Sequence, residues 1–271
     1  MSDVTRDGWG SWRAHTPARI ALGRSGASLP TSEVLALALA HAQARDAVHR
    51  PLDVAALARA VGGAGAVESA APDRASYLRR PDLGRTLSAA SRLRLEVEAG
   101  CDLALVLADG LSPQAVQDHA PPLLAALRPL LERAGFRVAA PVIATQARVA
   151  LGDEVAAAIG ARAVAVLIGE RPGLSVPSSL GVYVTWAPLP GRTTDAGRNC
   201  ISNVRPEGLP YDAAAARLAW LLDAARRRGL TGVALKDDSG AASLDAAPPP
   251  PGRLSDDAQG AAVTVVHMPP L

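Results

Sequence analysis

The sequence predicts an α/β fold, and three observations lead to this prediction. From residue 101 onward, short aliphatic runs alternate with segments of helical periodicity, as in βαβ units. Glycine or a helix-capping residue stands at most of the junctions between them. The 271 residues are 49% hydrophobic but only 3% aromatic, so the core has to be built from Ala, Val and Leu. We therefore expect a Rossmann-like, mostly parallel sheet with helices on both faces, preceded by a smaller helical region.

The N-terminal 99 residues predict an arm and then helices. Residues 1–30 are rich in glycine and proline, which is typical of an extended arm. Residues 31–99 form the predicted helical region. Its first helix begins at Thr31 or Ser32, either of which can cap it, and stops before Pro51. A shorter helix is expected from the cap Asp53 to residue 61, then a flexible loop over 62–66, and a helix over 77–85 with Pro81 near its first turn.

Residues 100–236 supply the predicted sheet domain, and residues 237–271 an acidic tail. Strands are expected at 102–108, 136–144, 164–168, 182–186 and 231–235, with helices at 112–134, 152–159 and 211–228. The tail is rich in Ala, Pro and Asp, which predicts disorder, although its apolar residues 263–266 could add a strand.

Several protein classes are excluded by missing signals. The arginines are scattered and form no stripe for nucleic acid, and no apolar run is long enough to span a bilayer. The two cysteines, Cys101 and Cys200, form neither a disulfide framework nor a CxxC metal pair. There is no GxGxxG fingerprint, P-loop, GxSxG elbow or zinc-spaced cluster. Without a recognisable signal peptide, we expect a cytoplasmic protein that binds something large and polar.

Polar groups follow three of the predicted strands. Arg148 to Ala150 come after the second strand, and the break toward Gly152 can leave their backbone amides free. Glu170 follows the third strand, and Cys200 lies beyond the fourth. Because α/β sheets bind ligands at the carboxyl edge of their strands, we expect a rigid ligand rimmed with amides here. Two alternatives stay open: a surface salt link between Glu170 and an arginine, and Cys200 as a nucleophile beside a distant histidine.

Longer motifs in the same region resemble the small subunit, or light chain, of ethanolamine ammonia-lyase. They are YLRRPDLGR at 77–85, ADGLS at 108–112, RV at 148–149, GDE at 152–154, LIGERPGL at 167–174 and NCISNVRPEG at 199–208. They stand in the family's order, and the resemblance covers roughly residues 16–236. The combination of GERPGL with CISN is the most specific part.

The resemblance implies a cofactor and a partner. The family's small subunit helps to hold adenosylcobalamin at the interface with a large subunit. The holoenzyme converts ethanolamine to acetaldehyde and ammonia by a radical mechanism. By motif, the cobalamin contacts fall on Val149, through its backbone amide, and on Glu170 and Cys200. Ethanolamine and the catalytic residues are expected on the large subunit, so none is assigned here.

Two further expectations concern the state of the cofactor and the place of the protein. None of the five histidines lies in an Asp-x-His-x-x-Gly motif, which favours a base-on cofactor, as the resemblance also does. The resemblance leaves open whether the chain enters a bacterial microcompartment. An assembly or structural subunit with a vestigial ligand pocket is the alternative function.

Overall fold

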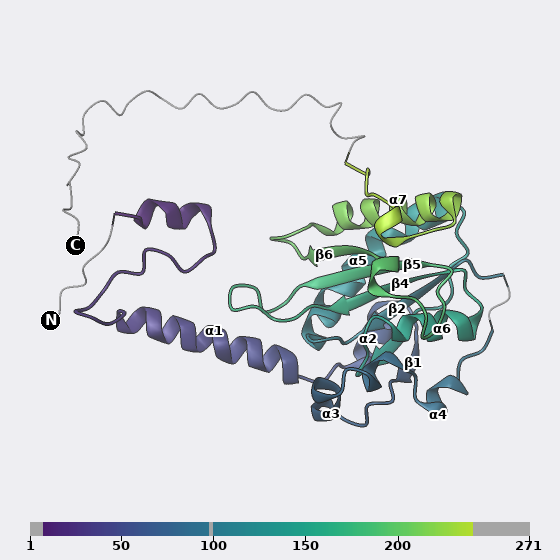
Figure 1. The fold of residues 1–271 in the computed structure, drawn as a ribbon, viewed down its shortest axis with the longest axis horizontal. Coiled ribbons are helices and arrows are strands. Elements are labelled where there is room, and N and C mark those ends of the chain that lie inside the picture. The colour runs from purple at the N-terminus through teal and green to yellow at the C-terminus, as the bar shows by residue number, and fades with distance from the viewer. Residues whose placement is uncertain (1–7, 98–99, 241–271) are drawn as a thin grey trace, which may run out of the picture. The chain divides into compact units, whose positions relative to one another are not determined.

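The computed structural model describes residues 8–97 and 100–240, and a sheet lies at its centre (Figure 1). Within these residues the sheet has six strands in the order β1-β3-β2-β4-β5-β6. The strands are β1 (Gly65–Glu68), β2 (Leu103–Ala108), β3 (Val142–Thr145), β4 (Ala163–Gly169), β5 (Leu180–Trp186) and β6 (Asn199–Val204).

The sheet is mixed. β1, β3, β2 and β4 pair in parallel, whereas β5 pairs antiparallel with both β4 and β6. The predicted α/β class is confirmed, but the Rossmann-like, mostly parallel description holds only for the first four strands. The cause is the connection between β4 and β5, because residues 170–179 contain no helix and a parallel pair needs a long crossover.

The main helices start and stop largely as the sequence predicts. They are α1 (Thr31–His49), α2 (Val54–Ala60), α3 (Arg74–Arg79), α4 (Ala89–Arg92), α5 (Pro113–Arg133), α6 (Leu151–Ile159) and α7 (Tyr211–Arg228). The Asp53 carboxylate accepts the Ala56 amide hydrogen, and the Ser112 hydroxyl that of Ala115, so these two caps are confirmed. The cap expected at Thr31 or Ser32 is wrong, because Pro30 occupies the N-cap position of α1 and no side chain caps the helix. α6 ends at Gly160 in the left-handed region, where glycine is favoured.

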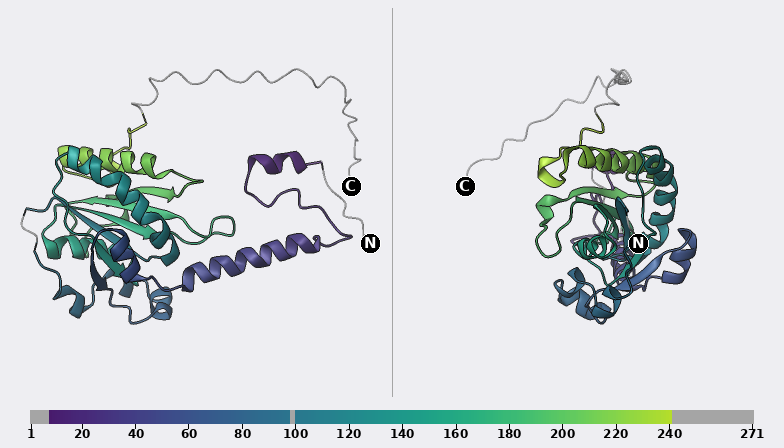
Figure 2. Two further views of the ribbon diagram at one scale, coloured as in Figure 1. Left: turned by 180° about the vertical axis from the view of Figure 1, so that it is seen from behind. Right: turned by 90° about the vertical axis from the view of Figure 1, so that its right-hand side faces the viewer.

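Helices cover both faces of the sheet (Figures 1 and 2). In β2 the odd-numbered leucines pack toward α5 on one face, and the even-numbered residues pack toward α6 on the other. α2 and α7 join α5 on its face. On the α6 face, β6 exposes Cys200 and Ser202. At the edge strand β6, this face of the sheet is therefore exposed.

Two predicted elements have other boundaries. The helix expected around 77–85 lies earlier, at Arg74–Arg79, and Pro81 follows its end, so the placement of Pro81 in the first turn is wrong. Pro81 disfavours a helical Arg80, and a 3-10 turn follows at Leu83–Arg85. The strand expected over 136–144 is shortened to β3, which starts after Pro141, a residue without an amide hydrogen.

The strand predicted at 231–235 is wrong, since these residues hold the 3-10 turn Gly232–Ala234. Gly232 has φ 83°, which interrupts an extended chain. The Asn199 side chain accepts the Gly232 amide hydrogen at 2.8 Å and donates to the Leu235 carbonyl at 2.8 Å. These contacts hold the turn where a strand was expected.

Two strands were not predicted. β1 begins within the predicted loop 62–66 and forms one edge of the sheet; a short strand with a single buried side chain gives little signal. β6 forms the other edge, with only Ile201 and Val204 buried. Most of its other residues are polar, so its sequence resembles a loop.

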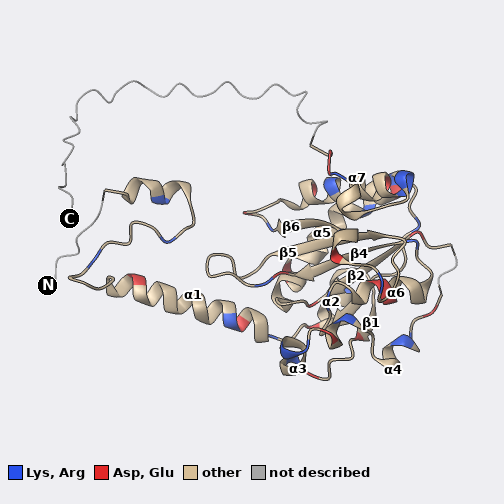
Figure 3. Cartoon of the chain, in the orientation of Figure 1, with Lys and Arg blue, Asp and Glu red and all other residues tan. Residues whose placement is uncertain are grey.

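The described residues up to Asp237 form one compact unit, and Asp238 begins a second. The predicted acidic tail, including residues 263–266, lies almost wholly outside the described residues. The division of residues 1–236 into arm, helical region and sheet domain stays a prediction. Charged residues are spread over most elements, with three arginines together in the last turn of α7 (Figure 3). No helix in the described ranges is both long and apolar enough to cross a membrane.

Candidate ligand-binding site

A cavity of about 470 Å³ lies at the carboxyl ends of β2 and β4. Its lining comes from the turns after these two strands and from the turn before α6, with Tyr77 of α3 and Tyr183 of β5. It includes two predicted site residues, Val149 and Glu170, but not Cys200. This edge is where α/β sheets hold their ligands. Another cavity, of about 310 Å³, lies between α5 and the segment 136–141 before β3, and its lining is mainly aliphatic.

The turn before α6 presents free backbone donors. The Arg148 amide donates to the Gly84 carbonyl at 2.8 Å, and the Leu151 and Gly152 amides begin the helical pattern. Between them, the amides of Val149 and Ala150 have no acceptor among the described residues. The first amides of a helix lack intrahelical partners and carry its partial positive charge. The predicted Val149 amide is thus a free donor in the lining segment.

Asp109, directly after β2, stabilises the turn before α6 through its carboxylate. Its carboxylate accepts the amide hydrogens of Gln146 at 2.8 Å and Ala147 at 2.9 Å, and it pairs with Arg74 at 3.4 Å. Gln146 has φ 53°, a left-handed conformation that these contacts hold in place. Burial raises the pKa of Asp109, while its hydrogen bonds and Arg74 act in the opposite direction.

Tyr77 supports the same turn from the side. Its buried hydroxyl donates to the Ala147 carbonyl at 3.1 Å. Its ring contacts two guanidinium groups, those of Arg74 at 4.8 Å and Arg148 at 4.4 Å from the ring centre. A Cβ at Gly84 would lie 2.9 Å from both this ring and the Arg148 side chain, so the packing needs glycine there.

Glu170 is a fixed acceptor at the end of β4. Its carboxylate accepts the Ser179 hydroxyl at 2.6 Å and the Asn203 amide hydrogen at 3.2 Å. A Cβ at Gly181 would lie 3.2 Å from the Glu170 side chain, so this glycine leaves room for the carboxylate. Among the described residues Glu170 has no ion pair with an arginine, so no surface salt link of this carboxylate is seen there.

Cys200 lies beside the cavity and outside its lining. It is exposed on β6 and pairs with Tyr183, which does line the cavity. Desolvation raises the pKa of the Cys200 thiol, and a hydrogen bond with Tyr183 opposes this effect. Desolvation also raises the pKa of Tyr183, to about 12. A thiol with a raised pKa is neutral at physiological pH and a poor nucleophile.

No histidine of the described chain contacts Cys200. His119 is instead engaged by the hydroxyls of Tyr211 at 2.9 Å and Ser178 at 3.2 Å. His267 lies outside the described residues. The described geometry gives Cys200 a tyrosine neighbour in place of a general base.

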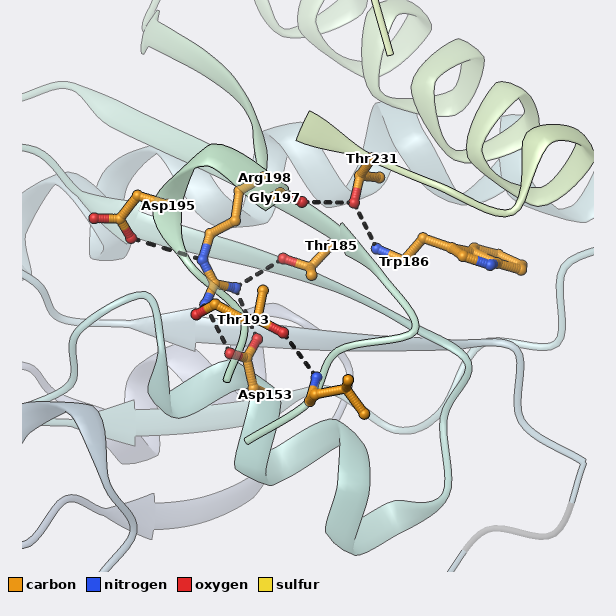
Figure 4. Close-up of polar contacts among 9 residues, drawn as sticks. Asp153, Thr185, Trp186, Thr193, Asp195, Gly197, Arg198 and Thr231 are labelled. Atoms are coloured by element: carbon orange, nitrogen blue, oxygen red, sulfur yellow. Dashed lines mark hydrogen bonds and ion pairs between the residues drawn. The ribbon is translucent and has the colours of Figure 1, made fainter. Parts of the chain in front are cut away.

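A buried ion pair connects α6 to β6 (Figure 4). The Arg198 guanidinium donates to both carboxylate oxygens of Asp153 at 2.7 Å and to the Thr185 hydroxyl at 2.8 Å. Both charged side chains are only 1% exposed. Because Asp153 lies in the first turn of α6 and Arg198 directly precedes β6, this pair fixes the Val149 turn relative to the strand of Cys200.

The sequence did not single out the residues that support the site. Asp109, Tyr77 and Arg198 act across 38, 70 and 45 positions of the chain. One signal was present: each of the three lies within or next to a sequence motif that resembles the light-chain family. Together they present backbone donors on one wall and a carboxylate acceptor on another, an arrangement suited to a polar ligand with both kinds of group.

Comparisons with known proteins agree on one family. The family model described as "Ethanolamine ammonia-lyase light chain (EutC)" matches residues 6–236. An ethanolamine ammonia-lyase small subunit from Azotobacter vinelandii is 54% identical over 262 residues, covering 93% of this chain and 97% of the relative. One from Ralstonia nicotianae is 52% identical, covering 90% and 93%. The chain therefore belongs to the ethanolamine ammonia-lyase light-chain family.

Proposed function

We propose that the chain is the small subunit of an adenosylcobalamin-dependent ethanolamine ammonia-lyase. In this proposal, the cavity beside β4 holds one side of a base-on cobalamin at the interface with a large subunit. The observation that carries the proposal is that one cavity is lined both by Val149, whose backbone amide is a free donor, and by the held carboxylate of Glu170.

The donors and acceptor match the edge of a corrin. A corrin ring carries carboxamide side chains, each of which offers a carbonyl acceptor and N–H donors. The Val149 amide would donate to such a carbonyl, and the Glu170 carboxylate would accept from such an N–H. A carboxylate has about four lone-pair positions, so Ser179 and Asn203 leave acceptor capacity unused.

Cys200 fits the same proposal as a neutral contact. Its raised pKa keeps it a thiol, which is a weak hydrogen-bond donor and acceptor. Because β6 exposes it next to Tyr183, it would meet a part of the cofactor that extends beyond the cavity.

The size of the cavity fits a shared site. Pockets that enclose a drug-sized ligand measure roughly 300–1,000 Å³, and a cobalamin is much larger than such a ligand. A cavity of about 470 Å³ would cover only part of it. The relatives are called small subunits, which implies a large subunit to cover the rest.

This division of labour leaves the reaction to the cofactor and the partner. Adenosylcobalamin supplies radical chemistry when bound, and the protein supplies binding, orientation and exclusion of water. We assign no catalytic residue to this chain. The Val149 turn, Glu170 and Cys200 would orient the corrin, while ethanolamine would be bound by the large subunit. The cytoplasmic location expected from the sequence also stays a prediction.

The test is a cobalamin titration of the complex reconstituted with the large subunit. Glu170→Ala removes the acceptor, and a lost hydrogen bond to a charged group costs about 1.5–3 kcal/mol. We expect a rise in Kd of roughly 10- to 150-fold, measured by the change in absorbance of the cofactor. Glu132→Ala, which removes a carboxylate at the other cavity, should leave Kd unchanged.

Two results would contradict the proposal. An unchanged Kd for Glu170→Ala would remove Glu170 from the site. A complex that binds no cobalamin and forms no acetaldehyde with it would favour the alternative of an assembly subunit with a vestigial pocket.

A further inference from the structure

Arg148 brings a positive charge to the cavity without a counterion. It contributes to the lining next to Val149, and its guanidinium stacks on Tyr77 at 4.4 Å. Among the described residues it has no hydrogen bond from its side chain and no ion pair, and its Nε is buried without a partner. Its stacking fixes the group, while its hydrogen-bonding capacity is unused.

Arg74 and Arg198 also have one buried guanidinium nitrogen without a partner, but these and other partly or fully buried arginines have a counterion. Arg74, Arg198 and Arg226 each pair with an aspartate, at 3.4, 2.7 and 2.9 Å. Arg148 is half-buried, and burying its Nε without a hydrogen bond or a counterion is costly, so its place in the cavity lining indicates an anion that arrives with the ligand.

The surroundings of Arg148 also suit an anion. Its own amide is fixed on Gly84, and the two amides that follow it, at Val149 and Ala150, are free at the start of the nine-residue helix α6. A planar guanidinium and the amino end of a helix are both common partners of phosphate. Glu170, the carboxylate of the cavity, accepts hydrogen bonds from Ser179 and Asn203 and forms no ion pair with Arg148, so it does not serve as the counterion.

Building on the proposed function, we infer that Arg148 binds the phosphodiester of a base-on cobalamin. The corrin side chains of cobalamin are neutral carboxamides, and the phosphodiester that joins the ring to the dimethylbenzimidazole carries its negative charge. Arg148 would thus recognise the nucleotide arm, while the Val149 amide and Glu170 recognise the ring. Arg148 is a binding residue in this assignment and takes no part in the reaction.

The experiment compares two probes that differ in this group. Cyanocobalamin contains the phosphodiester, whereas cyanocobinamide lacks the whole nucleotide arm. Both are titrated, by absorbance, into the complex of this chain with the large subunit. For Arg148→Gln we expect cyanocobalamin to bind about ten- to a hundredfold more weakly, the effect of one charge-assisted hydrogen bond. The affinity for cyanocobinamide should not change.

Three further variants sharpen the comparison. Arg148→Lys keeps the charge and loses the planar fork, so its preference for cyanocobalamin should fall less. Arg171→Gln removes an exposed guanidinium of the same lining and should have a smaller effect. Arg162→Gln is the matched control, because Arg162 also stacks on an aromatic ring, Trp186 at 5.5 Å, but lies outside the cavity. It should change neither affinity.

The ratio of the two affinities decides the outcome. This ratio cancels any general loss of folding or assembly, and Arg148→Lys supplies it if Arg148→Gln does not fold. A ratio unchanged by both substitutions would overturn the assignment of Arg148 and leave the proposed function intact. A wild-type complex that binds neither probe would instead overturn the proposed function.

Discussion

Tyr77 is the residue on which the turn before α6 most depends. Its hydroxyl satisfies the Ala147 carbonyl, its ring carries the guanidinium of Arg148, and its packing requires glycine at position 84. Two positions after Ala147 stands the free amide of Val149. One buried phenol therefore controls both the shape of the turn and the orientation of the cavity's cation.

Tyr77→Phe should destabilise the protein at neutral pH. The substitution leaves the buried Ala147 carbonyl without its donor, at a cost of about 1–2 kcal/mol in the free energy of unfolding. The cost should diminish in alkaline solution. Burial raises the pKa of Tyr77 above the unfolded value of about 10, so the folded protein keeps a proton that the unfolded chain loses.

Because the pKa of Tyr77 is raised in the folded protein, the stability falls as the pH rises. The stability contributed by a neutral Tyr77 is fully present below pH ~10 and is lost as the pH rises further. Urea unfolding between pH 7 and 11 should show a steeper alkaline decline for the wild type than for Tyr77→Phe. Tyr183, whose pKa is also raised, is present in both proteins and cancels. Parallel curves would show that the Tyr77 hydroxyl is not buried as described.

At the scale of elements, α6 and β6 are joined by one ion pair. Asp153 and Arg198 are both buried, and their two hydrogen bonds at 2.7 Å cross from the first turn of α6 to the start of β6. α6 carries the Val149 turn at its amino end, and β6 carries Cys200. The relative position of these two predicted site residues therefore depends on this pair.

Removing one partner of this pair should be worse than removing both. Asp153→Leu or Arg198→Met alone leaves a buried charge unpaired, which costs about 3–5 kcal/mol in the free energy of unfolding. The double variant replaces both charges with apolar groups and should recover most of that loss. Urea unfolding of the wild type, the two single variants and the double variant gives the coupling free energy between the two side chains.

A surface pair serves as the control. Asp82→Asn breaks the exposed contact with Arg80 at 2.6 Å and should leave the free energy of unfolding nearly unchanged. Equal destabilisation by the single and double variants of the buried pair would contradict a coupled ion pair.

The sequence predicted those elements whose signal is local. β2 and β4 are fully buried aliphatic runs, and α5 and α7 have a clear apolar stripe, so their positions follow from pattern alone. β6 was missed because an edge strand with one exposed face is largely polar. The predicted strand at 231–235 failed because Asn199, distant in sequence, holds Gly232 in a turn.

The candidate site divides in the same way. Val149 and Glu170 could be placed at the sheet edge because each directly follows a predicted strand or its turn. Cys200 was expected with them. The antiparallel pairing of β5 and β6 instead places it next to Tyr183, which lines the cavity, and outside the lining itself. The contacts of Asp109, Tyr77 and Arg198 join distant parts of the chain, and no local pattern reports such contacts.

At the scale of the whole molecule, the N-terminal arm and α1 expose several large apolar side chains to solvent. Trp9, Trp12, Leu35 and Leu39 are each more than half exposed. Leu35 and Leu39 lie one turn apart on the same side of α1. Proteins rarely expose such groups together unless a partner covers them. Because the family's members are small subunits, we propose the large subunit as that partner.

The variant Leu35→Asp/Leu39→Asp should weaken assembly and leave folding intact. Both side chains are already exposed, so the thermal unfolding of the isolated chain should hardly change. Loss of two buried leucines at an interface should weaken association with the large subunit by roughly tenfold or more, measured by sedimentation of the mixed chains. Val233→Asp is the control, because Val233 is 89% exposed outside α1 and the arm. If the double variant assembles as tightly as this control, the large subunit does not cover α1, and its contact has to be sought nearer the cavity.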